Sequence, residues 1–207
     1  MTIRFPVRVA SAIMAAAALA ATPVFAKEKF DEAGYKAAIA KAENGDADVD
    51  YGWLRKQATA ASGFFGSNWE TRQKAEELYQ QEPDKALALA KARMAQDWTD
   101  FLPHMMAAHI HRTLEQPAEA ERQNRIAMGL LRSITGGHKG TSAEDAFDAV
   151  NVPEEYRTLM TMGLIPERQA LVPKDGHNFD VFTIKAREGK PAREVWFNID
   201  AFFGKQF

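Results

Sequence analysis

Two stretches of the chain, PDKALALAKARM at residues 83–94 and PAEAERQNRIAM at residues 117–128, indicate how its N-terminal part folds. Each begins with a proline, which suits the first turn of a helix, and continues with apolar residues at helical spacing. The two prolines are 34 residues apart, and so are Ala86 and Ala120. This is the period of tetratricopeptide repeats, in which pairs of helices stack on one another. We therefore expect stacked tetratricopeptide-like helical hairpins, and an ordinary helical bundle in an alanine-rich chain is the alternative.

Caps and breaks place the ends of the expected helices across residues 27–135. Asparagine followed by glycine commonly ends a helix, and Ser, Asp or Pro commonly begins one. These signals predict a helix that ends at Asn44-Gly45, followed by helices that begin at Asp48 or Asp50, at the capping box Ser67-x-x-Glu70, at Pro83, near Asp100 and at Pro117.

The pattern changes after the glycine-rich break at residues 136–140. Short helices are expected around Ala146 and Phe147 and again from Pro153 to Met162, where Gly163 follows as a cap. The region from 136 to 207 is therefore not a continuation of the repeats.

Extended segments dominate the end of the chain. FDVFTIKA at residues 179–186 and EVWFNID at residues 194–200 are rich in β-branched and aromatic residues and predict two strands, to which residues 168–172 could add a third. The expected fold is α+β and mainly α: helical hairpins followed by a small C-terminal antiparallel β-hairpin or sheet. We expect the helical region and residues 136–207 to pack as one continuous domain.

Residues 1–26 have the pattern of a secretory signal peptide. Arg4 and Arg8 give a positive start, the segment Val9–Ala21 is apolar, and small residues precede a cleavage site after Ala26. An uncleaved membrane anchor is the alternative, but thirteen helical residues reach only about 20 Å across a hydrocarbon core of about 30 Å. We therefore expect an exported protein that is periplasmic or secreted.

Composition excludes several classes of protein. The 207 residues are 46% hydrophobic and 26% charged, which is typical of a globular chain. Removal of residues 1–26, which carry two arginines and no acid, leaves 181 residues and moves the net charge from −2 to −4. An acidic chain does not suggest a nucleic-acid partner. The absence of cysteine excludes disulfides, thiolate metal sites and cysteine nucleophiles. No later segment is apolar enough for stable membrane insertion after signal cleavage.

Three histidines, His104, His109 and His111, could suggest a metal site. On a helix, His104 and His111 share a face but lie about 10 Å apart, and His109 points away from both. No carboxylate is placed to complete a ligand set. We expect packed or surface histidines, and neither a metal nor another cofactor.

The loop GGHKGTS at residues 136–142 resembles phosphate-binding loops in composition but not in order, because its lysine precedes the last glycine. His138, Lys139 and the start of the helix that follows could still hold a carboxylate or another anion. A linker that ends in a helix cap is the alternative.

Carboxylates occur in two further places. Glu154 and Glu155 are adjacent on an expected helix, so they do not face each other as a glycosidase pair must, and both fit the first helical turn. We expect Tyr156 to pack its ring and to form a hydrogen bond through its hydroxyl group. Asp180 and Asn198 interrupt apolar strands and could line a small pocket, or lie on an exposed face.

An ordered series of short motifs resembles an uncharacterised family of secreted bacterial proteins, a domain of unknown function with tetratricopeptide-like helices. The resemblance covers most of the mature chain and is strongest from about Ala107 onward. It implies an exported protein with a helical front and a C-terminal β-hairpin, and it supplies no catalytic residue. The motifs are Gly129–Ile134, the Gly/His/Lys loop, Glu154-Glu155-Tyr156, Leu164, Gln169, Phe179-Asp180 and Trp196–Ile199.

These observations favour a periplasmic protein-interaction or scaffold module without catalysis, whose partner is a protein or peptide segment of the cell envelope. No serine has the Gly-x-Ser-x-Gly setting of a hydrolase nucleophile. The alternative is an envelope enzyme or small-ligand binder with a pocket between the helical layer and the sheet. The candidate binding residues for either are His138, Lys139, Tyr156 and Asp180.

Overall fold

A computed structural model describes residues 29–62, 74, 77–187 and 191–204. The predicted signal peptide with its cleavage site at Ala26 lies outside these residues, and so does the capping box predicted at Ser67 and Glu70. Among the helices that are described, none has the length and apolar character needed to cross a membrane.

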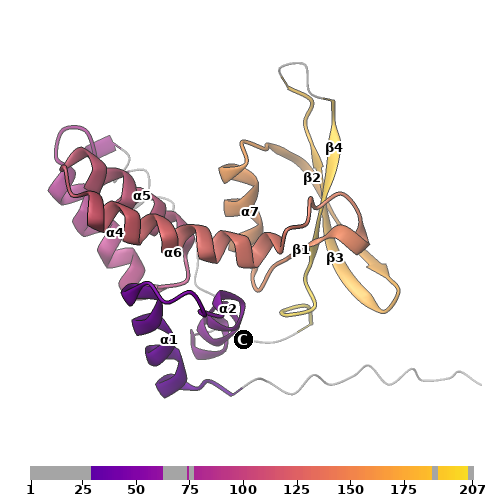
Figure 1. Cartoon of the computed structure of the whole chain (residues 1–207). Coiled ribbons are helices and arrows are strands. Elements are labelled where there is room, and N and C mark those ends of the chain that lie inside the picture. The colour runs from indigo at the N-terminus through magenta and orange to yellow at the C-terminus, as the bar shows by residue number, and fades with distance from the viewer. Residues whose placement is uncertain (1–28, 63–73, 75–76, 188–190, 205–207) are drawn as a thin grey trace, which may run out of the picture.

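The N-terminal part consists of paired antiparallel helices, and the prediction of an α+β fold is confirmed (Figure 1). The helices α4, α5 and α6 follow one another along the chain and pack side by side as two consecutive hairpins. Helix α6 also contacts α1 and α2, so that it joins the two ends of the helical layer. The helices of this layer are α1 (Glu32–Asn44), α2 (Tyr51–Ser62), α4 (Pro83–Gln96), α5 (Phe101–Thr113) and α6 (Pro117–Thr135).

Local signals fix the ends of these helices. The carboxylate of Asp50 accepts a hydrogen bond from the backbone N–H of Trp53, as expected of a residue that precedes a helix. Pro83 and Pro117 occupy the first turns of α4 and α6. Gly45 ends α1 with a φ of 85°, a left-handed conformation that favours glycine.

The C-terminal part is a four-stranded sheet with the order β1-β4-β3-β2. Strands β2, β3 and β4 are antiparallel neighbours, as predicted from the β-branched and aromatic segments at residues 179–186 and 194–200 and from the possible third strand at residues 168–172. Helix α7 lies between this sheet and the helical layer (Figure 1). The elements are α7 (Val152–Thr161), β1 (Phe147–Asp148), β2 (Pro166–Lys174), β3 (His177–Ile184) and β4 (Arg193–Asn198).

The short helix predicted around Ala146 and Phe147 is wrong. A 3₁₀ helix covers only Ala143–Asp145, and Phe147 begins β1, which pairs in parallel with β4. Phe147 is buried against the ring of Phe197, with ring centroids 5.4 Å apart. Burial of a large aromatic side chain on the sheet therefore prevails over the weak helical pattern.

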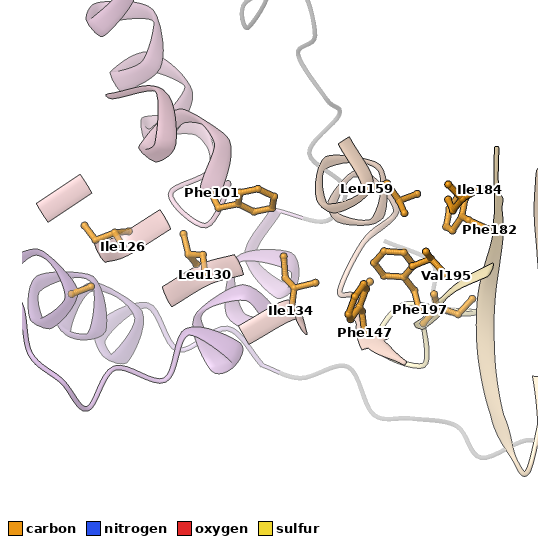
Figure 2. Close-up of a cluster of buried hydrophobic side chains, with 13 residues drawn as sticks. Phe101, Ile126, Leu130, Ile134, Phe147, Leu159, Phe182, Ile184, Val195 and Phe197 are labelled. Atoms are coloured by element: carbon orange, nitrogen blue, oxygen red, sulfur yellow. The ribbon is translucent and has the colours of Figure 1, made fainter. Parts of the chain in front are cut away.

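One hydrophobic cluster contains side chains from the helical layer, from α7 and from the sheet (Figure 2). Leu130 on α6, Leu159 on α7 and Phe182 on β3 have no exposed surface. The cluster therefore includes residues on both sides of the predicted boundary at residue 136. Figure 2 also labels Phe101, Ile126, Ile134, Phe147, Ile184, Val195 and Phe197 in this cluster.

Candidate functional site

Helix α7 is the structural link between the helical layer and the sheet. Four consecutive residues, Glu154, Glu155, Tyr156 and Arg157, interact with four different segments. Successive side chains on a helix point about 100° apart, so a short helix can reach in several directions at once. Three of the four are ionisable and buried, so each must either have a partner that compensates its charge or be neutral.

Glu154 holds α7 to the helical layer. Its two carboxylate oxygens accept hydrogen bonds from Nε and Nη2 of Arg55 on α2, at 2.9 and 2.8 Å. At most 4% of either side chain is exposed. Arg55 also donates to the carbonyl oxygen of Ser133, and the backbone N–H of Val150 donates to Glu154. Because the ion pair is bidentate and its remaining groups are satisfied, it fixes one orientation of α7.

Arg157 makes a second connection to the helical layer. Its Nη2 lies 3.4 Å from Oδ2 of Asp100, the residue that caps the start of α5. Nε of Arg93 on α4 lies 3.1 Å from the same oxygen. One buried carboxylate thus connects α4, α5 and α7.

Glu155 points toward the sheet, where the carboxylate of Asp180 on β3 is its charged neighbour. No N–H or O–H group of the described residues donates to either oxygen of Glu155. Burial, and then the neighbouring Asp180 carboxylate, raise the pKa of Glu155 to about 9. With a pKa of about 9, Glu155 is protonated at neutral pH, so that the two neighbouring carboxyl groups do not both carry a negative charge.

Tyr156 extends this network outward. Its hydroxyl group donates to the Gln169 side-chain oxygen at 2.9 Å, and the amide of Gln169 donates to Asp180 at 2.7 Å. The ring of Tyr156 packs edge-on against Phe182, with centroids 5.3 Å apart. The predicted packing and hydrogen bond of Tyr156 are therefore confirmed.

A pair of neighbouring carboxyl groups of which one is protonated can perform acid–base chemistry, but this pair is enclosed. Glu155 has no exposed surface and Asp180 is 7% exposed. A general acid or base must come within hydrogen-bond distance of its substrate, and a pair enclosed in this way does not. We therefore interpret the pair as a contact that holds α7 on the sheet. The sequence contains one signal for it: Asp180 shares its strand face with the apolar residues Phe182 and Ile184, both of which are buried.

The four candidate binding residues form two separate groups in place of one pocket. Tyr156 and Asp180 belong to the α7 network, whereas His138 and Lys139 surround the Asp145 side chain. The Asp145 carboxylate accepts from the backbone N–H of Lys139 and from the hydroxyl of Thr141, each at 3.1 Å. Burial alone would raise the pKa of Asp145, but these hydrogen bonds lower it. The place predicted for an anion is thus taken by a carboxylate of the chain itself.

The other polar candidates also have structural partners. Both ring nitrogens of His104 are in hydrogen-bond contact, with Gln123 and with the carbonyl oxygen of Trp98. Asp180 is opposite Phe197 in the sheet register and Asn198 is opposite Phe179, so Asp180 and Asn198 lie on opposite faces and form no polar pair.

A groove of about 410 Å³ lies at the C-terminal end of α7, next to the end of β3 and the start of β4. Its lining comes from the residues that follow α7, from the end of β3 and from the start of β4. The backbone N–H of Lys185 donates to the carbonyl oxygen of Ile165 at 3.1 Å, which closes the floor between these segments. The lining residues are Met162, Gly163, Leu164, Ile165, Ile184, Lys185, Arg187, Pro191 and Arg193.

Two features make this groove a candidate binding site. Met162 and Ile165 are 39% and 47% exposed, although both are apolar. Among the lining residues that the structure describes, the charged ones are cations, namely Lys185, Arg187 and Arg193. The groove therefore combines an apolar surface with positive charge on a chain that carries a net negative charge.

Comparison of the chain with protein-family models, with curated proteins and with solved structures gives no match. The resemblance to a family of secreted proteins stays a prediction, and the site must be interpreted from its own geometry.

Proposed function

We propose that this protein is an exported bacterial interaction module that binds an acidic segment of another cell-envelope protein in the groove at the end of α7, without catalysis. The observation that carries this proposal is the coincidence of exposed apolar and cationic side chains in one hollow. Apolar side chains of the partner fit against Met162 and Ile165, while Lys185 and Arg193 attract its carboxylates.

The shape of the groove supports a peptide segment as the ligand. It is open to solvent at Met162 and Ile165, and its volume falls within the range of about 300–1,000 Å³ that is typical of ligand sites. Its walls come from the segment that follows α7 and from the ends of β3 and β4, and the hydrogen bonds of Tyr156 and Gln169 link α7 to β2 and β3. A preorganised groove of this kind loses little conformational entropy when the partner binds.

The alternative is an envelope enzyme or small-ligand binder that uses His138, Lys139, Tyr156 and Asp180. It has less support, because His138 and the backbone N–H of Lys139 bond to Asp145, whereas Tyr156 and Asp180 both bond to Gln169. The proposed interaction module does not require these four residues to lie in one pocket.

Selection from a random peptide display library on the immobilised chain tests the proposal. We expect enrichment of peptides in which Asp or Glu adjoins a large apolar residue. The double variant Lys185→Glu/Arg193→Glu loses these peptides, because it reverses the charge of the groove. Leu171→Glu is the matched control: Leu171 on β2 is 51% exposed but does not line the groove, so this variant retains them.

Two results would contradict the proposal. One is a selection that enriches no acidic motif. The other is equal retention of the enriched peptides by the charge-reversed double variant and by wild type.

A further inference from the structure

A second cavity, also of about 410 Å³, lies between α1, α2 and the end of α4. Three aromatic residues, Phe30, Tyr35 and Trp98, contribute to its walls. The rings of Phe30 and Tyr35 stand edge to face, with centroids 5.6 Å apart and an interplanar angle of 62°. The remaining apolar lining is Ile39, Ala58, Ala61, Met94 and Ala95.

Asp97, a buried carboxylate, lines the same cavity. Its Oδ1 accepts hydrogen bonds from the backbone N–H and the hydroxyl of Thr99, at 3.0 and 2.7 Å. Its Oδ2 accepts none from the described residues, and Nη2 of Arg93 lies 3.7 Å away. Nε of the same guanidinium is engaged by Asp100. Among the described residues, this oxygen of a side chain that is only 5% exposed thus has an ion-pair neighbour at 3.7 Å but no hydrogen-bond donor.

The electrostatic character of the cavity is negative at this wall. Burial, and then the nearby Asp100 carboxylate, raise the pKa of Asp97, whereas the hydrogen bond from Thr99 and the two guanidinium groups of Arg157 and Arg93 lower it. Burial, and then the Asp97 carboxylate, also raise the pKa of the Tyr35 phenol. The two other charged lining residues, Glu32 and Lys36, form an exposed ion pair with each other.

We propose that this cavity binds an organic ammonium group, with its positive charge against Oδ2 of Asp97 and its methyl or methylene groups against the three aromatic rings. The faces of Trp, Tyr and Phe attract cations, and this attraction is stronger where water is excluded. A neutral apolar ligand of the same shape would remove water from the open carboxylate oxygen without replacing its hydrogen bond, which is unfavourable. The ligand class is therefore a small quaternary or primary ammonium compound, at a site separate from the groove.

Choline and its neutral isostere 3,3-dimethyl-1-butanol provide a test on the unmodified chain. Saturation-transfer NMR and calorimetric titration should show saturable binding of choline and binding of the neutral compound that is weaker by about tenfold or more. Equal affinity for the two compounds, or no saturable binding of choline, overturns the proposal.

Two variants locate the binding. Asp97→Asn keeps an acceptor for Thr99 but removes the charge, and Tyr35→Leu removes one ring; each should weaken choline binding by about tenfold. Asp46→Asn, which removes an exposed acid outside the cavity, is the charge-matched control and binds choline like wild type. Circular dichroism verifies that each variant is folded. Unchanged choline affinity in folded Asp97→Asn and Tyr35→Leu would place the ligand elsewhere and refute the assignment.

Discussion

Glu155→Gln tests the carboxyl pair that holds α7 on the sheet. In the unfolded chain Glu155 loses its proton near its ordinary pKa of 4.5, whereas in the folded chain it keeps the proton up to a pKa of about 9. Between these values the folded chain binds one proton more than the unfolded chain, so the free energy of unfolding falls as pH rises. The expected slope from this group is about 1.4 kcal/mol per pH unit, and it levels off above the folded pKa.

Glutamine replaces the protonated carboxyl group with a neutral amide that cannot ionise. The variant therefore lacks this contribution to the slope and becomes more stable than wild type as pH rises, by up to about 3 kcal/mol at neutral pH. Asp97 and Asp180 also have raised pKa values, but they are present in both proteins. The informative quantity is the difference between variant and wild type.

Urea unfolding followed by circular dichroism from mildly acidic to mildly alkaline pH measures that difference. Glu144→Gln is the control. The exposed Glu144 has a pKa lowered to about 2, mainly by its hydrogen bond to Lys174. It is therefore ionised in the folded and in the unfolded chain throughout this pH range. Its replacement should leave the pH dependence of the free energy of unfolding unchanged. A stability difference between Glu155→Gln and wild type that does not vary with pH would show that Glu155 is ionised in the folded protein, and would refute its protonation at neutral pH.

Three further predictions concern the Arg55–Glu154 ion pair, the hydrophobic core and the loop around Asp145. Arg55→Met leaves the Glu154 carboxylate buried without its cation and should lower the free energy of unfolding by about 3–5 kcal/mol in urea unfolding. The double variant Arg55→Met/Glu154→Gln should recover part of this loss. A loss below about 1 kcal/mol would contradict the importance of the ion pair. Leu130→Ala opens a cavity in the core and should lower the free energy of unfolding by about 2–5 kcal/mol, and a surface-like change within about 0.5 kcal/mol would contradict the burial. Asp145→Ala removes the acceptor for the Lys139 amide, so hydrogen exchange at that amide should accelerate with little change in melting temperature; unchanged exchange would show that Asp145 does not order the loop.

The ends of the helices could be predicted because their signals are local. The carboxylate of Asp50, the prolines at positions 83 and 117 and the glycine at position 45 act on backbone groups within a few residues. The strands could be predicted for a similar reason, since alternation of apolar residues along a segment indicates which face is buried.

The candidate sites depended on contacts that no local pattern encodes. Glu155 meets Asp180 only because α7 packs on one face of the sheet, and the helical spacing of Glu154 and Glu155 shows no more than that they diverge. The groove forms where Ile165 and Lys185, which are distant in sequence, are joined by a backbone hydrogen bond. Phe147 was expected in a helix because the parallel partner of β1 lies far along the chain.

The most direct test of the proposed function is a titration of the isotope-labelled chain with one acidic peptide from the display selection, followed by amide chemical shifts. Binding in the groove predicts that the largest shifts occur at residues 162–165, 184–187 and 193, and that they vanish in Lys185→Glu/Arg193→Glu. If the largest amide chemical-shift changes occurred around the aromatic cavity or on the helical layer, with none at the end of α7, the proposed function would be contradicted.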